Sequence, residues 1–336
     1  MQDINILRNK ITMNMKLNKT VLILTIIASF FTSCAYDDSY LDAKLPKNMA
    51  YFASLKDYTR TVVVGEGLQF RIGAAMAGAL HNDFDRTVNF KLGTTAFALT
   101  DTSHVLMPTD YYNYTSLLGT DGTAQAIIPK GSFIGFFPIV LDSVKFLNDP
   151  LALKGKFSIP VKIVATSLDS INKVNDSVII KVKYMAGTEG YYLYKNTITK
   201  ELNGTIVGST VVENFANESN DQAWSMVTLA PFTVQVTAPI AEYTTSMKLT
   251  GSSVSTPLKF NLTVNSTGIS YQQVSGQATI QNDGANFYDK KTHDFNLKYT
   301  FKKPSNDTIY HVTSNLIFRN RMRDGINETR DYLNKL

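Results

Sequence analysis

A run of tyrosines is the part of this chain whose chemistry best suits sugar binding. Tyr111, Tyr112 and Tyr114 occupy three of four consecutive positions, next to Asp110 and Asn113. Aromatic rings stack on the apolar face of a pyranose, while carboxylates and amides pair with its hydroxyl groups. Neighbouring side chains of an extended segment face opposite sides, so the three rings cannot all enter one core. We therefore predict that these tyrosines contact a ligand; ordinary packing of partly exposed tyrosines is the alternative.

The single tryptophan is a second candidate. Trp224 follows the polar residues Asn220, Asp221 and Gln222, which suits a ligand contact, although a tryptophan in a barrel core is the alternative. A different group, Tyr191, Tyr192 and Tyr194, alternates across a predicted strand. Packing is the simpler reading there, because Tyr192 and Tyr194 would share one face.

Three alternating arginines near the C-terminus offer another chemistry. In an extended segment, Arg319, Arg321 and Arg323 would place three guanidinium groups on one side. They could bind an acidic sugar or a phosphate with two hydrogen bonds each. They could also close the end of a barrel by donating to backbone carbonyls, and we favour this second interpretation.

The sequence carries no catalytic or metal-binding signature. The four histidines, His81, His104, His293 and His311, lack the spacing of metal ligands, so we expect no metal site and no cofactor. A glycosidase needs two carboxylates roughly 5–10 Å apart, and the chain has many acidic residues without one pair standing out. We predict a protein that is not an enzyme, with a hydrolase as the alternative.

The only cysteine follows a short, largely apolar run near the N-terminus. Lys16 and Lys19 precede Val21–Phe31, a run of eleven residues, which is shorter than the roughly 20 that span a bilayer. This arrangement is typical of an export signal and resembles a bacterial lipoprotein signal. We predict that residues 1–33 are a signal peptide, with the true start at Met13 or Met15, and that Cys34 is the lipidated first residue of the mature protein.

Charge and length limit what the mature chain can be. Removal of residues 1–33 takes away four basic residues and Asp3, which lowers the formal net charge from +5 to +2. A nearly neutral chain has no electrostatic footprint for nucleic acid. Without a second cysteine there is no disulfide framework. The remaining length suggests two domains, preceded by a lipidated tether over residues 34–48.

From Met49 onward the pattern changes to short alternating runs separated by turn residues, which is typical of antiparallel β structure. In the first half these runs are Ala50–Ser54, Thr61–Val64, Leu68–Gly73, Thr87–Leu92, Ala124–Ile128, Phe136–Leu141, Lys156–Ala165 and Ser177–Tyr184. In the second half they are Tyr191–Thr199, Thr205–Glu213, Ala223–Leu229, Phe232–Val236, Tyr243–Thr250, Leu258–Thr263, Ile269–Gln273, Gly276–Gln281, Phe295–Lys302 and Thr308–Arg319. We predict a β-sandwich over residues 49–186 and a closed antiparallel barrel over residues 187–336.

Several local features refine this prediction. The turn Gly65-Glu66-Gly67 indicates a hairpin, and the loop 303–307 indicates another. Pro160 inside an apolar run places its strand at an edge or at a bulge. A helix over Leu68–Leu80 is a weak alternative, and the tail Arg319–Arg330 is too charged and irregular for a strand.

Parts of the chain resemble uncharacterised domain families of Bacteroidota surface lipoproteins. The resemblance rests on residues 107–113, 128–131 and 159–184, and then on 191–194 and 319–330. It implies an immunoglobulin-like β-sandwich followed by a lipocalin-like barrel, in a surface glycan-binding protein of a polysaccharide-utilisation locus. It identifies no binding residue.

The acidic pair Asp37-Asp38 resembles the signal that sends such lipoproteins to the outer face of the outer membrane, although an ordinary polar linker is equally open. We therefore expect a lipid-anchored protein of the outer membrane that faces the cell exterior. Its expected partners are a polysaccharide or oligosaccharide and an outer-membrane glycan transporter complex. Besides a hydrolase, the rival interpretation is a structural or adhesive surface protein of the fimbrial type, which would need exposed strand edges.

Overall fold

The computed structural model describes residues 47–53, 57–93, 103–114, 123–215, 223–240, 243, 247–249, 252–254, 257–304 and 306–333. The predicted signal peptide, Cys34 and most of the tether lie outside these residues. Within them, no helix combines the length and the hydropathy that crossing a membrane requires.

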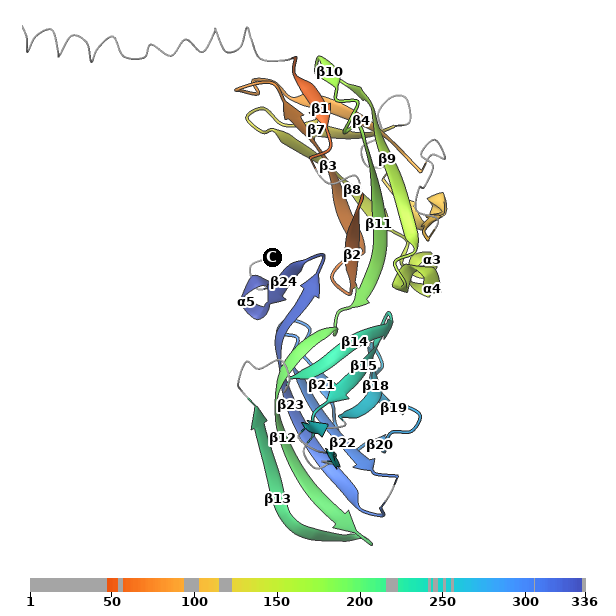
Figure 1. Ribbon diagram of the computed structural model, residues 1–336, viewed down its shortest axis with the longest axis vertical. Coiled ribbons are helices and arrows are strands. Elements are labelled where there is room, and N and C mark those ends of the chain that lie inside the picture. The colour runs from red at the N-terminus through yellow and green to blue at the C-terminus, as the bar shows by residue number, and fades with distance from the viewer. Residues whose placement is uncertain are drawn as a thin grey trace, which may run out of the picture. The chain divides into compact units, whose positions relative to one another are not determined.

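The all-β prediction is confirmed, because two eleven-stranded sheets hold most of the described chain (Figure 1). One is a half-barrel and the other is a nearly closed barrel. Both belong to one compact unit, Met49–Ala77 with Asn82–Leu336. Residues 78–81, between β3 and β4, are irregular bends.

The first sheet precedes Gly187 and has the order β10-β1-β3-β8-β7-β4-β9-β11-β2, with β5 beside β9 and β6 beside β8. Its strands are β1 (Met49–Tyr51), β2 (Asp57–Val64), β3 (Gln69–Ala77), β4 (Arg86–Leu92), β5 (Val105–Leu106), β6 (Tyr112–Asn113), β7 (Ala124–Ile128), β8 (Ile134–Leu141), β9 (Phe157–Thr166), β10 (Ser170–Ile171) and β11 (Ser177–Ala186). Three short helices, η1 (Thr109–Tyr111), α3 (Ser143–Asn148) and α4 (Pro150–Leu153), lie in its connections.

Most of the segment Leu68–Leu80 is strand β3, so the helical alternative is wrong. Its alternation buries Ile72 and Ala74. Gly73, which argued against a helix, serves sheet packing instead, because the ring of Phe136 on β8 covers it. A Cβ at Gly73 would lie 2.6 Å from that ring.

The predicted hairpin at Gly65-Glu66-Gly67 is wrong, although the turn exists. The Glu66 N–H donates to the Val63 carbonyl at 3.2 Å, and both glycines have positive φ. The flanking strands do not pair, because β2 adds in parallel to β11 while β3 pairs with β1 and β8. The turn therefore joins two strands that do not pair with each other, and the side chain of Glu66 reaches Arg321 in the second sheet.

Pro160 lies at neither an edge nor a bulge, which corrects that prediction. Strand β9 runs between β4 and β11, and its register shift lies several residues further on, opposite Asn89 and Phe90. The Pro160 carbonyl accepts from the Gly93 N–H at 3.0 Å, one residue past the end of β4. The N–H that proline lacks would point in the same direction as this carbonyl, past the end of β4. No hydrogen bond to a carbonyl of β4 is therefore lost.

The second sheet begins at Gly190 and has the order β19-β18-β15-β14-β12-β23-β22-β20, with β13 beside β12, β21 beside β22 and β24 beside β23. Its strands are β12 (Gly190–Leu202), β13 (Thr205–Phe215), β14 (Trp224–Ala230), β15 (Thr233–Ala238), β18 (Leu258–Asn265), β19 (Gly268–Gln273), β20 (Thr279–Asn282), β21 (Phe287–Tyr288), β22 (Phe295–Lys302), β23 (Ile309–Arg323) and β24 (Ile326–Thr329). A short pair, β16 (Met247–Leu249) and β17 (Ser252–Val254), and the helix α5 (Arg330–Leu333) complete the described elements.

Pairing between the first and last long strands bends this sheet toward closure. Strand β12 pairs with β23 over almost its whole length, and every described pair in the sheet is antiparallel. Because β strands show alternate side chains to each face, one face of the curved sheet gathers a hydrophobic core that contains many aromatic rings. The predicted hairpin loop at 303–307 joins β22 and β23 and is confirmed.

Most of the charged tail forms two paired strands, so the prediction that it is not a strand is wrong. Strand β23 continues to Arg323 and forms a hairpin with β24. The side chain of Arg321 is fully buried, and two carboxylates, from Glu66 and Glu328, compensate its charge. Charge in a strand is tolerated when it is paired inside the fold, which the residue types alone did not reveal.

Candidate functional site

The predicted tyrosine cluster is used largely in packing. Tyr112 is buried and its ring stacks on that of Tyr114 at 6.2 Å between centroids. Tyr111 is half-buried, its ring edge meets Phe157, and its hydroxyl donates to Asp149 at 3.1 Å. Burial raises the pKa of Tyr112 to about 12, and the nearby Tyr114 adds to this. Tyr111 and Tyr114 keep some exposed surface, so their contact with a ligand stays a prediction.

Trp224 lies in the core of the second sheet, far from solvent. Its side chain is fully buried, and its ring meets those of Tyr194, Phe260 and Tyr299 at 6.1–6.5 Å. This placement agrees with the alternative interpretation, in which Trp224 packs in the core. A ligand could reach Trp224 only if the packed interior opened.

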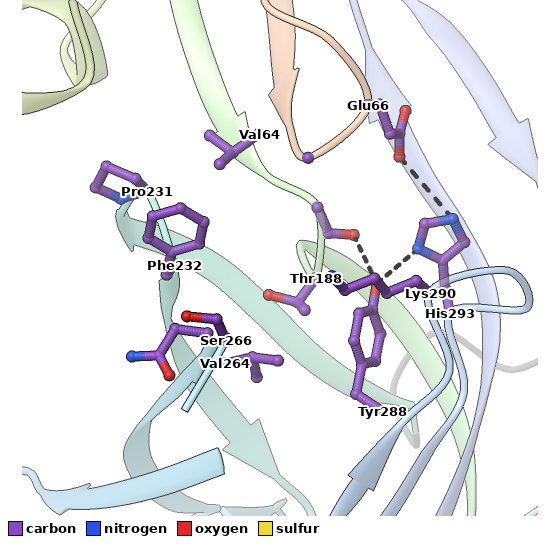
Figure 2. Close-up of a pocket in the computed structure, with 13 residues that line it drawn as sticks. Val64, Glu66, Thr188, Pro231, Phe232, Val264, Ser266, Tyr288, Lys290 and His293 are labelled. Atoms are coloured by element: carbon purple, nitrogen blue, oxygen red, sulfur yellow. Dashed lines mark hydrogen bonds and ion pairs between the residues drawn. The ribbon is translucent and has the colours of Figure 1, made fainter. Parts of the chain in front are cut away.

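A pocket of about 300 Å³ lies among turns of the second sheet, the β2–β3 turn and the segment between β11 and β12 (Figure 2). None of its residues was a predicted ligand contact. The residues that line it are Val64, Gly65, Glu66, Gly187, Thr188, Pro231, Phe232, Val264, Asn265, Ser266, Tyr288, Lys290 and His293.

One side of the pocket is apolar. Phe232 is half exposed, with 50% of its surface accessible, and lies beside Pro231 in the turn between β14 and β15 (Figure 2). The Val264 N–H donates to the Phe232 carbonyl at 2.8 Å, which fixes this turn against the end of β18. The turn that carries Phe232 is therefore held in place, while half of the surface of this residue stays accessible.

The opposite side is polar and is built by the loop between β21 and β22. The Tyr288 hydroxyl and the His293 Nδ1 are 2.8 Å apart (Figure 2). The Asp289 carboxylate accepts from the backbone N–H groups of Lys291 and Thr292, and the His293 N–H donates to the Asp289 carbonyl at 2.7 Å. These bonds close a tight loop and present the imidazole toward Glu66.

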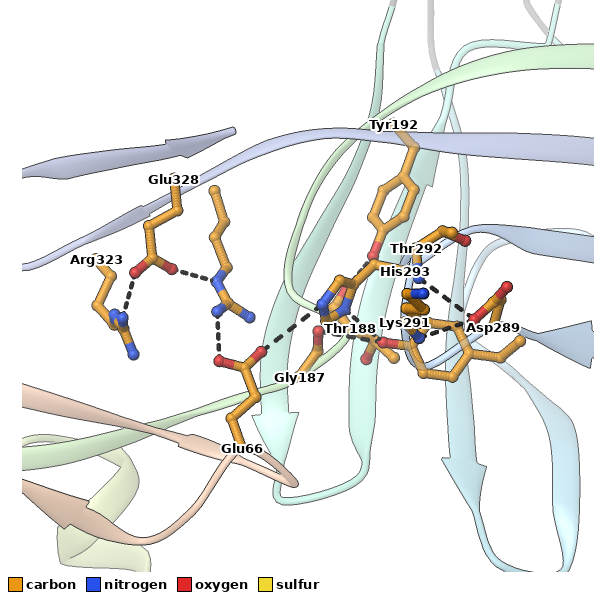
Figure 3. Close-up of polar contacts among 12 residues, drawn as sticks. Glu66, Gly187, Thr188, Tyr192, Asp289, Lys291, Thr292, His293, Arg323 and Glu328 are labelled. Carbon is orange, nitrogen blue, oxygen red and sulfur yellow. Dashed lines mark hydrogen bonds and ion pairs between the residues drawn. The ribbon is translucent and has the colours of Figure 1, made fainter. Parts of the chain in front are cut away.

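A chain of charges supports this side from behind (Figure 3). The Arg321 guanidinium donates to Glu66 Oε2 at 2.7 Å and to Glu328 Oε2 at 2.6 Å. Arg323 pairs with the second oxygen of Glu328. Arg321 and Glu328 are fully buried, so the pairing that compensates their desolvation also fixes Glu66 at the pocket.

The environment sets the protonation of these groups. Burial lowers the pKa of His293; Glu66 works against this shift, and the positive charge of Arg321 adds to it. Burial also opposes the charge of Arg321, but the hydrogen bonds and charges of Glu66 and Glu328 outweigh it and raise the pKa of the guanidinium. Burial raises the pKa of Tyr288. At neutral pH the polar side therefore presents a neutral imidazole, a neutral phenol and a fixed carboxylate.

This arrangement can hold a small ring with one apolar face and a hydroxylated edge. The exposed aromatic ring supplies a stacking surface, and Glu66, Asn265 and Ser266 supply hydrogen-bond partners. Glu66 is the one carboxylate among the lining residues. No cluster of metal-ligating side chains occurs in the parts of the chain that the structure describes.

Sequence reasoning missed this pocket because its residues are scattered over five connections. Phe232 was assigned to a strand, yet β15 begins one residue later. The available signal was Pro231-Phe232, an aromatic residue after a proline between two alternating runs. Such a position favours a turn, where a ring stays exposed.

Comparisons with known proteins support the fold and leave the activity open. No protein-family model matches the chain, and no curated protein matches its sequence. A crystal structure of a Bacteroides ovatus protein of unknown function has a TM-score of 0.58 and 19% identity, and covers 84% of this chain and 98% of that one. An auxiliary nutrient binding protein from Bacteroides thetaiotaomicron has a TM-score of only 0.32 and 11% identity, over 80% of this chain and 94% of that one. This chain is thus similar in fold to a Bacteroides protein whose function is unknown.

Proposed function

We propose that this protein is a non-enzymatic carbohydrate-binding protein that holds a sugar ring in the pocket beside Phe232. The supporting observation is the pairing of a half-exposed ring, fixed in a turn, with a hydrogen-bonding side formed by Glu66, Tyr288 and His293. A pyranose has an apolar face and a rim of hydroxyls, and these two sides match them.

The size of the pocket limits the ligand. Its volume of about 300 Å³ is at the lower end of the range of roughly 300–1,000 Å³ that is typical of small-molecule sites. A short terminal segment of a glycan, about one or two rings, therefore suits it better than an internal stretch of a long chain.

The proposal includes the predicted address of the protein. With Cys34 lipidated behind the export signal, the two sheets would stand at the outer face of the outer membrane on a short tether. A glycan held there could pass to an outer-membrane transporter complex, which is the partner that the sequence resemblance implies.

Binding is tested with the mature chain carrying Cys34→Ala, which keeps it unlipidated. A panel of oligosaccharides is screened and hits are titrated by calorimetry. We expect binding in the micromolar to millimolar range, and loss of affinity in Phe232→Ala by roughly ten- to hundred-fold, because burial of a phenylalanine ring contributes about 1.5–3 kcal/mol. Phe287→Ala is the matched control, since Phe287 is also exposed, at 63%, and does not line the pocket.

Two outcomes would overturn this function. The first is failure of every glycan to bind at millimolar concentration. The second is release of new reducing ends from a bound glycan, which would show the rival hydrolase.

The lipid anchor is tested separately by expressing the protein in a Bacteroidota host. Labelling with an alkyne fatty acid should mark the protein, and Cys34→Ala should abolish the label. An unprocessed chain that retains residues 1–33 would contradict the proposed address.

A further inference from the structure

Lys290 is the one charged group of the pocket that lacks a counter-charge among the described residues. It is exposed on the loop between β21 and β22, and it makes no ion pair or hydrogen bond with a described residue. Figure 2 shows Lys290 on the same side as Tyr288 and His293, across the pocket from Phe232.

Most other charged groups near the pocket already have partners, and Asp289, the neighbour of Lys290, accepts from the backbone N–H groups of Lys291 and Thr292. Glu66 is paired with Arg321, and Glu328 is shared by Arg321 and Arg323. Asp294 is paired with Arg330. His293 adds no charge at neutral pH, since burial lowers its pKa. Lys290 therefore gives the lining of the pocket a positive charge that has no ion-pair partner among the described residues.

We propose that the pocket selects a sugar whose ring carries an anionic group, either the carboxylate of a uronic acid or a sulfate ester, with Lys290 as its counter-charge. This inference rests on the proposed function and names the class of glycan that the same pocket takes. An ammonium group is a compact positive charge with several N–H donors, so it can bind either a carboxylate or a sulfate ester.

The rest of the pocket fits this orientation. Asn265 and Ser266 can donate to anionic oxygens, and Glu66, whose charge Arg321 already offsets, can accept from ring hydroxyls. The apolar face of the ring then covers Phe232. A neutral sugar would keep the stacking and the hydroxyl contacts but would lose the ionic contact.

The experiment compares three disaccharides that differ at one position: a terminal glucuronate, its glucose counterpart, and its 6-O-sulfated glucose counterpart. Each is titrated against the mature chain with Cys34→Ala, and against the same chain carrying Lys290→Gln or Lys291→Gln. Lys291 is the matched control, because it is the next residue, is also exposed, and does not line the pocket.

We expect at least one acidic disaccharide to bind about ten-fold more tightly than the neutral one, and Lys290→Gln to remove that preference while Lys291→Gln preserves it. The preference should shrink as salt is raised from about 0.05 to about 0.5 M, because Lys290 is exposed. An effect with glucuronate alone, or with sulfate alone, assigns the anion.

Equal affinity for all three disaccharides, unchanged by Lys290→Gln and lowered by Phe232→Ala, would overturn this inference and leave the proposed function standing. Failure of every glycan to bind would overturn both. An acidic preference that Lys290→Gln leaves intact would also refute the role of Lys290.

Discussion

The interior of the second sheet and the pocket among its turns both contain aromatic residues, but these residues differ in their exposure to solvent. Inside, Trp224, Phe260 and Tyr299 are fully buried and touch one another ring to ring. In the pocket, Phe232 is half exposed. An aromatic residue on the inner face of a curved strand becomes core, whereas one in a turn keeps a free face.

Their polar groups differ in the same way. In the interior, Asn196 bonds to both Glu213 and Ser314, so these buried polar side chains are partners of one another. In the pocket, Lys290 has no partner among the described residues. An exposed group whose interactions the fold has not used is therefore a better sign of a binding site than its residue type alone.

The largest effect is expected from Trp224→Ala. Removal of this fully buried ring should lower the free energy of unfolding by about 3–5 kcal/mol, through lost burial and the cavity left behind. Urea unfolding followed by circular dichroism measures it. A loss under about 1 kcal/mol together with abolished glycan binding would reverse the comparison and make Trp224 a ligand contact.

Arg321→Met should cost somewhat less, roughly 3–4 kcal/mol, because it leaves the buried Glu328 without its main partner while Arg323 still pairs with it. The double variant Arg321→Met with Glu328→Gln should recover part of this loss in the same unfolding assay. If both variants are equally destabilised, then the pairing does not carry the stability, and the support that we assign to Glu66 fails.

Two histidines should titrate on opposite sides of the ordinary value of about 6.5. Burial lowers the pKa of His293, whereas the hydrogen bond to Asp283, followed by that to Glu201, raises the pKa of His311. Because unfolded His293 binds a proton more readily than folded His293, its contribution to stability falls as pH drops below about 6.5. The contribution of His311 is complete below about 6.5 and is lost as pH rises through its folded pKa.

Ring NMR signals followed against pH give both midpoints, and His293→Gln should flatten the acid-side loss of stability. A midpoint for His293 at or above 6.5 would mean that the polar side of the pocket is as wet as an open surface. It would then lack the neutral imidazole that we assign to it.

The sequence was informative where alternation decides the structure. The runs Thr87–Leu92 and Ser177–Tyr184 became β4 and β11 with almost the predicted bounds, since period-two burial is a local property. The change of sheet between Ala186 and Gly190 falls in the glycine-rich stretch that interrupts the runs.

The sequence was uninformative where the interaction partners of a residue lie far away along the chain. Arg321 looked too polar for a strand because Glu66, 255 positions away, was not known to reach it. Gly65-Glu66-Gly67 looked like a hairpin because strand pairing, unlike a turn, is not local. Phe232 was missed because the pocket exists only when five connections meet.

Titration of one identified glycan against three proteins tests the central claim, that the pocket beside Phe232 is the binding site. The proteins are the mature chain with Cys34→Ala and the same chain carrying Phe232→Ala or Tyr114→Ala, with Tyr114 representing the half-buried tyrosines of the predicted cluster. We predict that Phe232→Ala weakens binding roughly ten- to hundred-fold and that Tyr114→Ala stays within about two-fold of the chain with Cys34→Ala alone. A strong loss of affinity in Tyr114→Ala, with unchanged affinity in Phe232→Ala, would contradict this prediction and place the binding site at the tyrosine cluster.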